Sequence, residues 1–153
     1  MPGMVLLSVP ARAPPLPREL SVRRAAGEGL WAALMHVTDL GFGVKPPDTL
    51  GTVFPFNLAP VLRGYVGFVA RKPVAGSLGL SYRGVGGVYF VSTVPEFRGK
   101  GYGTALTWSA IIGARRDGCG TSFLEASELG YPVYSRMGYQ KLTSDSWWVM
   151  GPE

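Results

Sequence analysis

The spacing of hydrophobic residues divides the first third of the chain into a strand, a helix and a loop. Apolar and polar residues alternate over residues 20–23, which predicts a half-buried strand. Between residues 27 and 40 apolar side chains recur at helical spacing, and Gly41 and Gly43 predict the end of that helix. Residues 45–60 are rich in turn-forming residues, so we expect a loop with one short helix at most.

Three further strands are predicted in the middle of the chain. Apolar, β-branched and aromatic residues are concentrated in residues 65–70, 74–82 and 88–94. The Lys72-Pro73 pair predicts a tight connection, which makes the first two strands an antiparallel hairpin, and Gly86-Gly87 predicts the next turn. The nearly continuous apolar run of the third strand is typical of a strand in the middle of a sheet.

Helices and strands alternate in the last third of the chain. The pattern predicts a helix over residues 103–116 with one packed face, a strand over 121–126 and a short helix over 129–137. Two closing strands are predicted over residues 139–142 and 146–150.

This order of elements predicts an α+β fold with a mixed, mostly antiparallel sheet. Strands 88–94 and 121–126 are joined through a helix, so they are expected to run parallel to each other. No internal repeat is visible, and we expect residues 20–153 to form a single domain. Residues 1–19 contain five prolines and little hydrophobic pattern, which predicts an extended tail or linker.

Composition and charge exclude several classes of protein. Apolar residues make up 46% of the chain and charged residues only 16%, which indicates a folded protein. The net charge of +5 comes from scattered basic residues, so nucleic-acid binding is not expected. A single cysteine, Cys119, and a single histidine, His36, exclude an intrachain disulfide and predict no metal site. Because the apolar run near the start spans only residues 5–7, we expect a cytoplasmic protein with no membrane partner.

Alternating glycines follow the strand predicted over residues 88–94. Arg98-Gly99-Lys100-Gly101-Tyr102-Gly103-Thr104 leads directly into the next helix. Glycines allow the backbone to approach a ligand closely, and the first amides of a helix have no partner within it. Together these features are typical of a phosphate site, with Arg98 and Lys100 adding positive charge beside it. The alternative is a glycine-rich turn that only starts a helix.

Two common phosphate-binding loops do not fit this segment. A P-loop requires four residues between its first glycine and a Gly-Lys-Ser/Thr sequence, and the chain has none. A dinucleotide fingerprint requires G-x-G-x-x-G, whereas the spacing from Gly99 is one residue short and position 106 is leucine. Glu125 lies about where a ribose-binding acid would be expected, so a dinucleotide domain stays an alternative hypothesis.

The loop fits the pattern R-x-x-G-x-G, formed by Arg98, Gly101 and Gly103. In these residues the chain resembles the GNAT superfamily of N-acetyltransferases. A second block is similar to that family too: residues 124–127, then Gly130, then Tyr134-Ser135-Arg136-Met137-Gly138-Tyr139. The resemblance covers residues 20–150, and the predicted element order is also the family's order. It implies the GNAT fold, in which the strands at 88–94 and 121–126 splay apart.

The resemblance implies that acetyl-CoA is the cofactor. Backbone groups of Ser92 and Val94 would pair with the pantetheine amides, and a backbone N–H near Val94 would polarise the thioester. Ser127 would either contact the cofactor arm or cap the following helix. The diphosphate would be held by the loop that contains Arg98, Gly99, Lys100, Gly101, Tyr102, Gly103 and Thr104.

The resemblance also implies acetyl transfer to a primary amine, with Tyr134 as the catalytic residue. A thiol has a pKa of about 8.5 and a tyrosine one of about 10, so a hydrogen bond to the leaving sulfur is the expected role. No general base is assigned: Glu125 lies on a strand whose faces the sequence does not separate, and Glu96 and Glu128 lie outside the strands.

The amine acceptor is expected to be a small molecule or a peptide, and its class is not defined by the sequence. Phe42, Phe54, Phe56 and Tyr131 are candidates for the walls of its pocket. A homodimer is compatible with this interpretation. The alternative is a CoA-binding sensor or interaction module without catalysis, which the missing base would explain.

Overall fold

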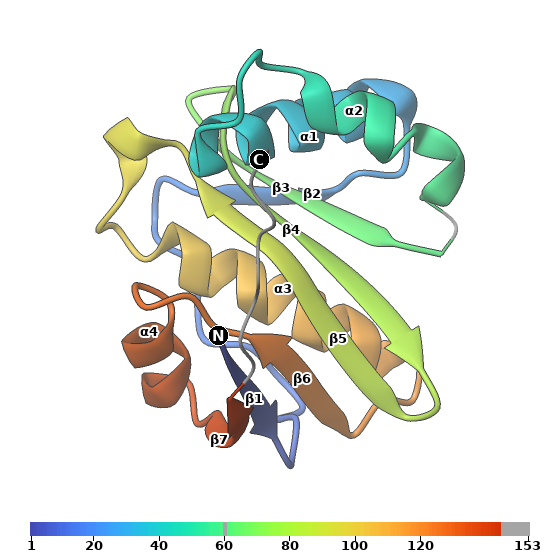
Figure 1. Ribbon diagram of the computed structural model, residues 1–153, viewed down its shortest axis with the longest axis vertical. Helices are drawn as coiled ribbons and strands as arrows, with labels where there is room; N and C mark the ends of the chain where they lie inside the picture. Colours follow the sequence, from blue (N-terminus) through green and yellow to red (C-terminus); the bar gives the residue numbers. More distant parts are fainter. Residues whose placement is uncertain (60, 145–153) are drawn as a thin grey trace, which may run out of the picture.

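A computed structural model describes residues 1–59 and 61–144 and shows a seven-stranded sheet with helices on both faces (Figure 1). The strands lie in the order β2-β3-β4-β5-β6-β1-β7. Only the pair β5–β6 is parallel within the described residues, which confirms the predicted α+β class and the predicted parallel pair. The strands are Pro2–Leu6 (β1), Ser21–Arg24 (β2), Arg63–Val69 (β3), Lys72–Tyr82 (β4), Val85–Thr93 (β5), Thr121–Glu125 (β6) and Gln140–Ser144 (β7).

Helices cover both faces of β4. Successive side chains of a strand point to opposite faces, so Gly76 and Ser77 show what packs on each. An added Cβ at Gly76 would meet Leu34, whereas the hydroxyl of Ser77 donates a hydrogen bond to the Leu106 carbonyl at 2.8 Å. Leu34 belongs to α1 and Leu106 to α3, so these two helices lie on different faces. The helices are Glu28–Phe42 (α1), Thr49–Val53 (α2), Tyr102–Arg116 (α3) and Tyr131–Arg136 (α4), with 3₁₀ turns at Phe56–Leu58 and Pro95–Phe97.

The parallel pair β5–β6 separates part of the way along its length. Its register runs from Val85 opposite Thr121 to Val88 opposite Leu124, and no pairing continues beyond that point. Phe90 has a φ of +51°, and the register of β5 against β4 shifts in the same region. This irregularity bends β5 away from β6. The splay implied by the GNAT resemblance is therefore present.

The turn between β4 and β5 lies before the predicted Gly86-Gly87. The chain reverses at Arg83 and Gly84, whose φ values are +46° and +80°. Gly86 instead lies within β5, where an added Cβ would come within 2.5 Å of the Ala114 side chain. The predicted turn is thus wrong by three residues, because Gly86 is needed for the close contact between β5 and α3.

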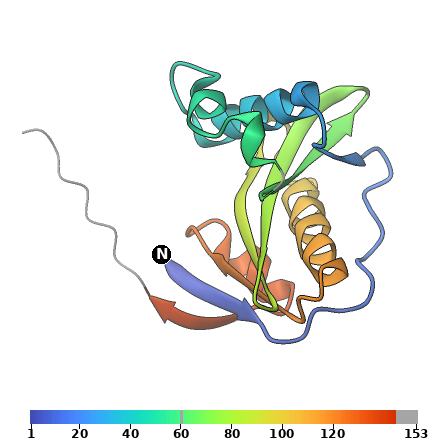
Figure 2. The same ribbon diagram turned by 90° about the vertical axis from the view of Figure 1, so that its right-hand side faces the viewer.

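The prediction that residues 1–19 form a tail is wrong for Pro2–Leu6. These residues form β1, which inserts between β6 and β7 and is antiparallel to both. Met4 is fully buried in the core. The segment that follows passes along the outside of α3 to reach β2 (Figure 2), and Arg115 donates a hydrogen bond to the Val9 carbonyl at 2.7 Å. The sequence signal was weak because β1 has only five residues, which include Pro2 and Gly3.

We expect Met4→Ala to lower the free energy of unfolding by about 2–5 kcal/mol, since it removes a fully buried side chain and leaves a cavity. Urea denaturation followed by fluorescence measures the change. Leu7→Ala is the matched control, because Leu7 is 66% exposed and its truncation should cost under about 0.5 kcal/mol. Equal effects of the two substitutions would show that β1 is not part of the folded core.

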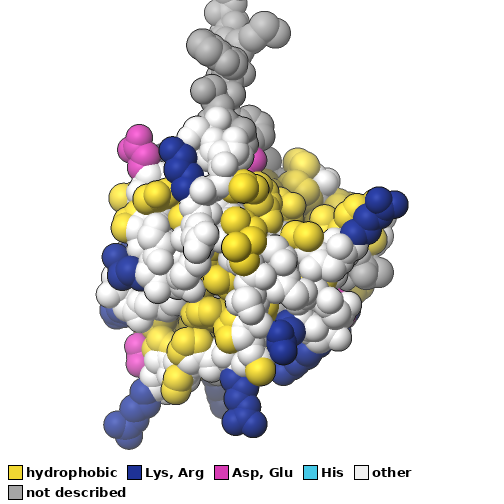
Figure 3. Space-filling view, turned by 90° about the horizontal axis from the view of Figure 1, so that it is seen from below, with side chains coloured by type: hydrophobic (Ala, Val, Ile, Leu, Met, Phe, Trp, Pro, Cys, Tyr) yellow, Lys and Arg dark blue, Asp and Glu magenta, His cyan; other side chains and the backbone are white. Residues whose placement is uncertain are grey.

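The predicted closing strand over residues 139–142 is present as β7, whereas the one over 146–150 lies outside the described residues. Figure 3 shows the molecule from the end that carries β1, β6 and β7, where apolar side chains gather and the Lys and Arg side chains stand apart from one another. Among the described helices, none is both long and apolar enough to cross a membrane.

Candidate active site

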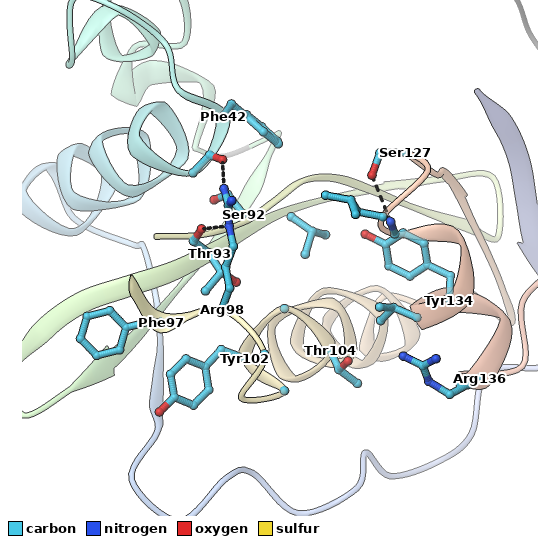
Figure 4. A pocket seen from close by; sticks show the side chains of 18 residues that line it. Phe42, Ser92, Thr93, Phe97, Arg98, Tyr102, Thr104, Ser127, Tyr134 and Arg136 are labelled. Carbon is cyan, nitrogen blue, oxygen red and sulfur yellow. Dashed lines mark hydrogen bonds between the residues drawn. The ribbon is translucent and has the colours of Figure 1, made fainter. Parts of the chain in front are cut away.

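The larger of two adjoining cavities has a volume of about 560 Å³ and lies where β5 has left β6 (Figure 4). Its walls come from the end of α1, the second half of β5, the glycine loop, the first turn of α3 and helix α4. Most predicted site residues line it: Ser92, Arg98, Gly99, Gly101, Tyr102, Gly103, Thr104, Ser127 and Tyr134. Val94 and Lys100 are not among the lining residues.

The glycine loop presents backbone amides to this cavity. Gly99 and Gly101 have φ values of +76° and +79°, which glycine adopts without strain. No side chain caps α3, and its first helical bond within the turn runs from the Ala105 amide to the Gly101 carbonyl. The amides of Tyr102, Gly103 and Thr104 precede that bond, so they have no carbonyl partner within the helix. Such a turn can hold an anion.

The two basic side chains of the loop are positioned differently from the expected phosphate contacts. Arg98 donates hydrogen bonds to the carbonyls of Gly41 at 2.7 Å and Thr93 at 3.3 Å, so it ties the end of α1 to β5. The Lys100 ammonium lies 5.3 Å from the centre of the Phe97 ring. Arg98 still lines the cavity, so its charge lies at the wall. Its hydrogen bonds connect the wall formed by the end of α1 to the wall formed by β5.

Tyr102 anchors the loop to the segment that precedes β2. Its ring is buried and its hydroxyl donates a hydrogen bond to the Glu19 carboxylate at 2.6 Å. This bond lowers the pKa of Glu19 and raises the pKa of Tyr102 to about 12. The hydroxyl therefore has a structural role, while the Tyr102 amide, which has no carbonyl partner within α3, can act as an anion donor.

Tyr134 extends from α4 toward the middle of the cavity (Figure 4). Burial raises its pKa, and the nearby Thr107 hydroxyl offsets part of that shift. The Tyr134 ring packs edge to face against Tyr139, with 6.0 Å between the ring centres. Its hydroxyl is consequently neutral at physiological pH and able to donate a hydrogen bond.

Two other predicted site residues have hydrogen-bond partners within the protein. The Ser127 hydroxyl accepts a hydrogen bond from the Gly130 amide at 3.1 Å, so it stabilises the turn before α4 while lining the cavity. The Val94 amide donates to the Val74 carbonyl at 2.9 Å, and the Val94 carbonyl accepts from the Phe97 amide at 2.9 Å. Both backbone groups of Val94 thus have partners within the protein. The predicted pantetheine contact stays a prediction, as does the polarisation of a thioester by a backbone N–H near Val94.

Sequence reasoning missed Phe97 and Arg136, which line the same cavity. The Lys72 and Lys100 ammonium groups both lie over the Phe97 ring, at 5.4 and 5.3 Å from its centre. Arg136 is the last residue of α4 and lines the cavity, as Thr104 does (Figure 4). Its spacing from Tyr134 offered no signal, because residues two apart on a helix do not share one face. Only the structure shows that both line the cavity.

A smaller cavity of about 290 Å³ adjoins the first. The two share Phe42, Val91, Ser127 and Tyr134 as lining residues. Glu125, at the end of β6, lines only the smaller cavity. Phe42 is thus the one predicted acceptor-pocket aromatic that reaches a cavity wall; Phe54, Phe56 and Tyr131 line neither cavity.

The buried tyrosines predict a loss of stability in alkali. Burial raises the pKa of Tyr65, Tyr134 and Tyr139 above the ordinary value of 10. Below pH 10 the folded and unfolded chains carry the same protons on these groups, whereas above it the unfolded chain loses protons first, so the free energy of unfolding falls. Urea midpoints should be flat from pH 8 to about pH 10 and drop beyond. Tyr139→Phe should reduce the drop, and Tyr82→Phe, at a site that is 65% exposed, should leave it unchanged.

Comparisons with known proteins agree with this geometry. The family model for the acetyltransferase (GNAT) domain matches residues 23–142. The chain therefore belongs to the GNAT acetyltransferase family. No match was found among curated protein sequences.

Solved structures share the fold at low sequence identity. A GCN5-related N-acetyltransferase from Kribbella flavida is 18% identical with a TM-score of 0.69, and the alignment covers 92% of this chain but 53% of that one. The chain thus spans about half the length of that relative. A predicted acetyltransferase from Clostridium acetobutylicum, solved with acetyl-CoA, is 19% identical with a TM-score of 0.62, covering 86% and 96% of the two chains. An aminoglycoside acetyltransferase from an uncultured soil metagenomic sample, in complex with sisomicin, is 14% identical with a TM-score of 0.64, covering 87% and 97%.

Proposed function

We propose that this protein is an N-acetyltransferase that moves the acetyl group of acetyl-CoA to a primary amine. The observation that carries the proposal is the position of the larger cavity, which joins the gap between β5 and β6 to the uncapped start of α3. A gap of this kind leaves backbone groups of β5 free to pair with an extended, amide-containing arm. The Gly99–Thr104 backbone would hold the diphosphate, because anions bind at helix N-termini.

Arg136 extends this fit at the wall of the same cavity. Its guanidinium offers planar, paired donors that suit a phosphate group of the cofactor. The apolar residues Val91 and Val133 also line the cavity, which suits the apolar parts of the arm. The residues present therefore fit a long, anionic, amide-bearing cofactor.

When bound, acetyl-CoA supplies a thioester carbonyl for attack and a thiolate that leaves. The amine nitrogen forms the new N–C bond as the C–S bond breaks, and the proton that the amine loses balances the one that the thiolate gains. Tyr134 donates a hydrogen bond to the sulfur as its negative charge develops. Burial of Tyr134 keeps that proton in place, since it raises the hydroxyl pKa.

The test combines cofactor binding with turnover. Calorimetry should show binding of acetyl-CoA, and a thiol-release assay with a broad panel of primary amines should show amine-dependent release of CoA. Tight binding of acetyl-CoA without release for any amine would overturn the proposal and favour a CoA-binding sensor. Stronger binding of NADH than of CoA would favour a dinucleotide domain.

A further inference from the structure

The smaller cavity lies against the larger one across Tyr134 and Val91. A group in the smaller cavity would therefore lie beside Tyr134, which also lines the cavity that contains the glycine loop. Its volume of about 290 Å³ is at the lower end of the range for small-molecule sites, roughly 300–1,000 Å³. The space suits a compact molecule rather than a large oligosaccharide.

Aromatic and aliphatic side chains form most of the wall of this smaller cavity. Phe90 packs edge to face against Phe42 and Phe54, with ring centres 6.1 and 5.1 Å apart. The positive φ of Phe90 turns β5 at this point, so that both Tyr89 and Phe90 reach the cavity although they are neighbours in sequence. Tyr89 is 42% exposed, which leaves one aromatic surface open to a ligand.

Glu125 is the one acidic residue that the described part of the chain contributes to this wall. It ends β6, one residue beyond the last pair of the β5–β6 ladder, and it lies opposite Gly3 of β1. Gly3 has no side chain that would cover the carboxylate. Glu125 is exposed, and no ion pair with it is formed by any residue of the described ranges. The rest of the wall is mostly aromatic and aliphatic, Met1 included, so its one carboxylate favours a ligand with one positive charge on an apolar body.

We propose that this cavity binds the amine acceptor, that Glu125 holds its ammonium group before transfer, and that the acceptor is a compact primary amine carried on an aryl or alkyl body. The inference rests on the proposed acetyl transfer. A carboxylate on the acceptor would be repelled by Glu125, so amino acids should be poor acceptors. A strongly polar amine would leave the aromatic wall without an apolar partner.

The first experiment compares 2-phenylethylamine, phenylalanine and ethanolamine as acceptors in the thiol-release assay. These three amines differ in the added carboxylate and in the missing ring. We expect kcat/KM for 2-phenylethylamine to exceed that for each of the others at least tenfold. A preference for phenylalanine or ethanolamine would overturn the inference while leaving the proposed N-acetyltransferase intact.

The second experiment tests Glu125 directly. Glu125→Gln should raise KM for 2-phenylethylamine about tenfold, as expected for loss of one charge-assisted contact, while the Kd for acetyl-CoA stays the same. Glu128→Gln is the matched control, because Glu128 is exposed three residues later and lines neither cavity. An unchanged KM in Glu125→Gln would refute the role of this carboxylate.

A binding readout separates this inference from the proposed function. If no amine releases thiol, the N-acetyltransferase proposal fails, and calorimetric titration of 2-phenylethylamine into the CoA-saturated protein then decides the inference alone. Binding that weakens in Glu125→Gln and persists in Glu128→Gln would support the site. Absence of binding to the wild-type protein would overturn it.

Discussion

Tyr134→Phe is expected to lower kcat about 100-fold while the Kd for acetyl-CoA and the KM for the amine change less than threefold. General acids typically contribute about 10²–10⁴-fold, and a hydrogen bond to a thiolate belongs at the lower end. Only the hydroxyl is removed, because the phenyl ring keeps its edge-to-face contact with Tyr139. The loss therefore falls on the transition state rather than on binding.

Steady-state thiol release and calorimetry measure this prediction. Tyr131→Phe is the matched control, since Tyr131 lies on the same helix but lines neither cavity. The wild-type kcat should also show no alkaline loss from Tyr134 below pH 10, because burial raises the pKa of this hydroxyl. A kcat in Tyr134→Phe within twofold of wild type would assign the role of acid to another group or to water.

The sequence predicted the topology because each element has a strong local signal. The apolar run at residues 88–94, the glycines that follow and the periodic helix at 103–116 together define a βαβ unit with one allowed arrangement. The family motif then predicted which strand pair would separate. The structure confirms that β5 and β6 are parallel and that their pairing ends at Val88 and Leu124.

Long-range pairing explains what the sequence did not predict. Pro2–Leu6 form β1 only because β6 and β7 leave a place between them, and a five-residue segment carries too little pattern to reveal such partners. The face of Glu125 was hidden for a similar reason. The polar Ser122 is buried on the same face as Leu124, where it is hydrogen bonded to the Tyr139 hydroxyl at 2.6 Å. A buried serine obscures the alternation that would have placed Glu125 on the other face.

The hydrogen-bond partners of each group are the other property that side-chain patterns do not predict. Val94 was predicted to offer its backbone to the cofactor, yet its amide and carbonyl are bonded to Val74 and Phe97. Arg98 fits the family motif, but its guanidinium binds the Gly41 and Thr93 carbonyls. Residue identity therefore predicted a set of residues most of which line one cavity, while the hydrogen bonds of each residue decide what it can do there.

Gly101→Val is expected to weaken CoA binding at least about 100-fold. Gly101 has a φ of +79° and immediately precedes α3. A β-branched residue is strained in this conformation, at a cost of order 1–3 kcal/mol. Its side chain would also enter open space beside the first helix amides, because no atom lies within 4 Å of an added Cβ at this position. The valine side chain would therefore keep the CoA diphosphate away from the first amides of α3, even if the backbone adopted the strained conformation.

Gly118→Val separates these two effects. Gly118 has a φ of +90° and equally open surroundings, but it follows the opposite end of α3. Both substitutions should lower the melting temperature by similar amounts, whereas only Gly101→Val should abolish CoA binding in calorimetry. Similar affinities for the two variants would mean that backbone strain alone limits binding. That result would remove the support for the loop amides as the diphosphate site. Gly101 lies beside the free amides at the start of α3, whereas Gly118 does not, so only Gly101→Val should block them.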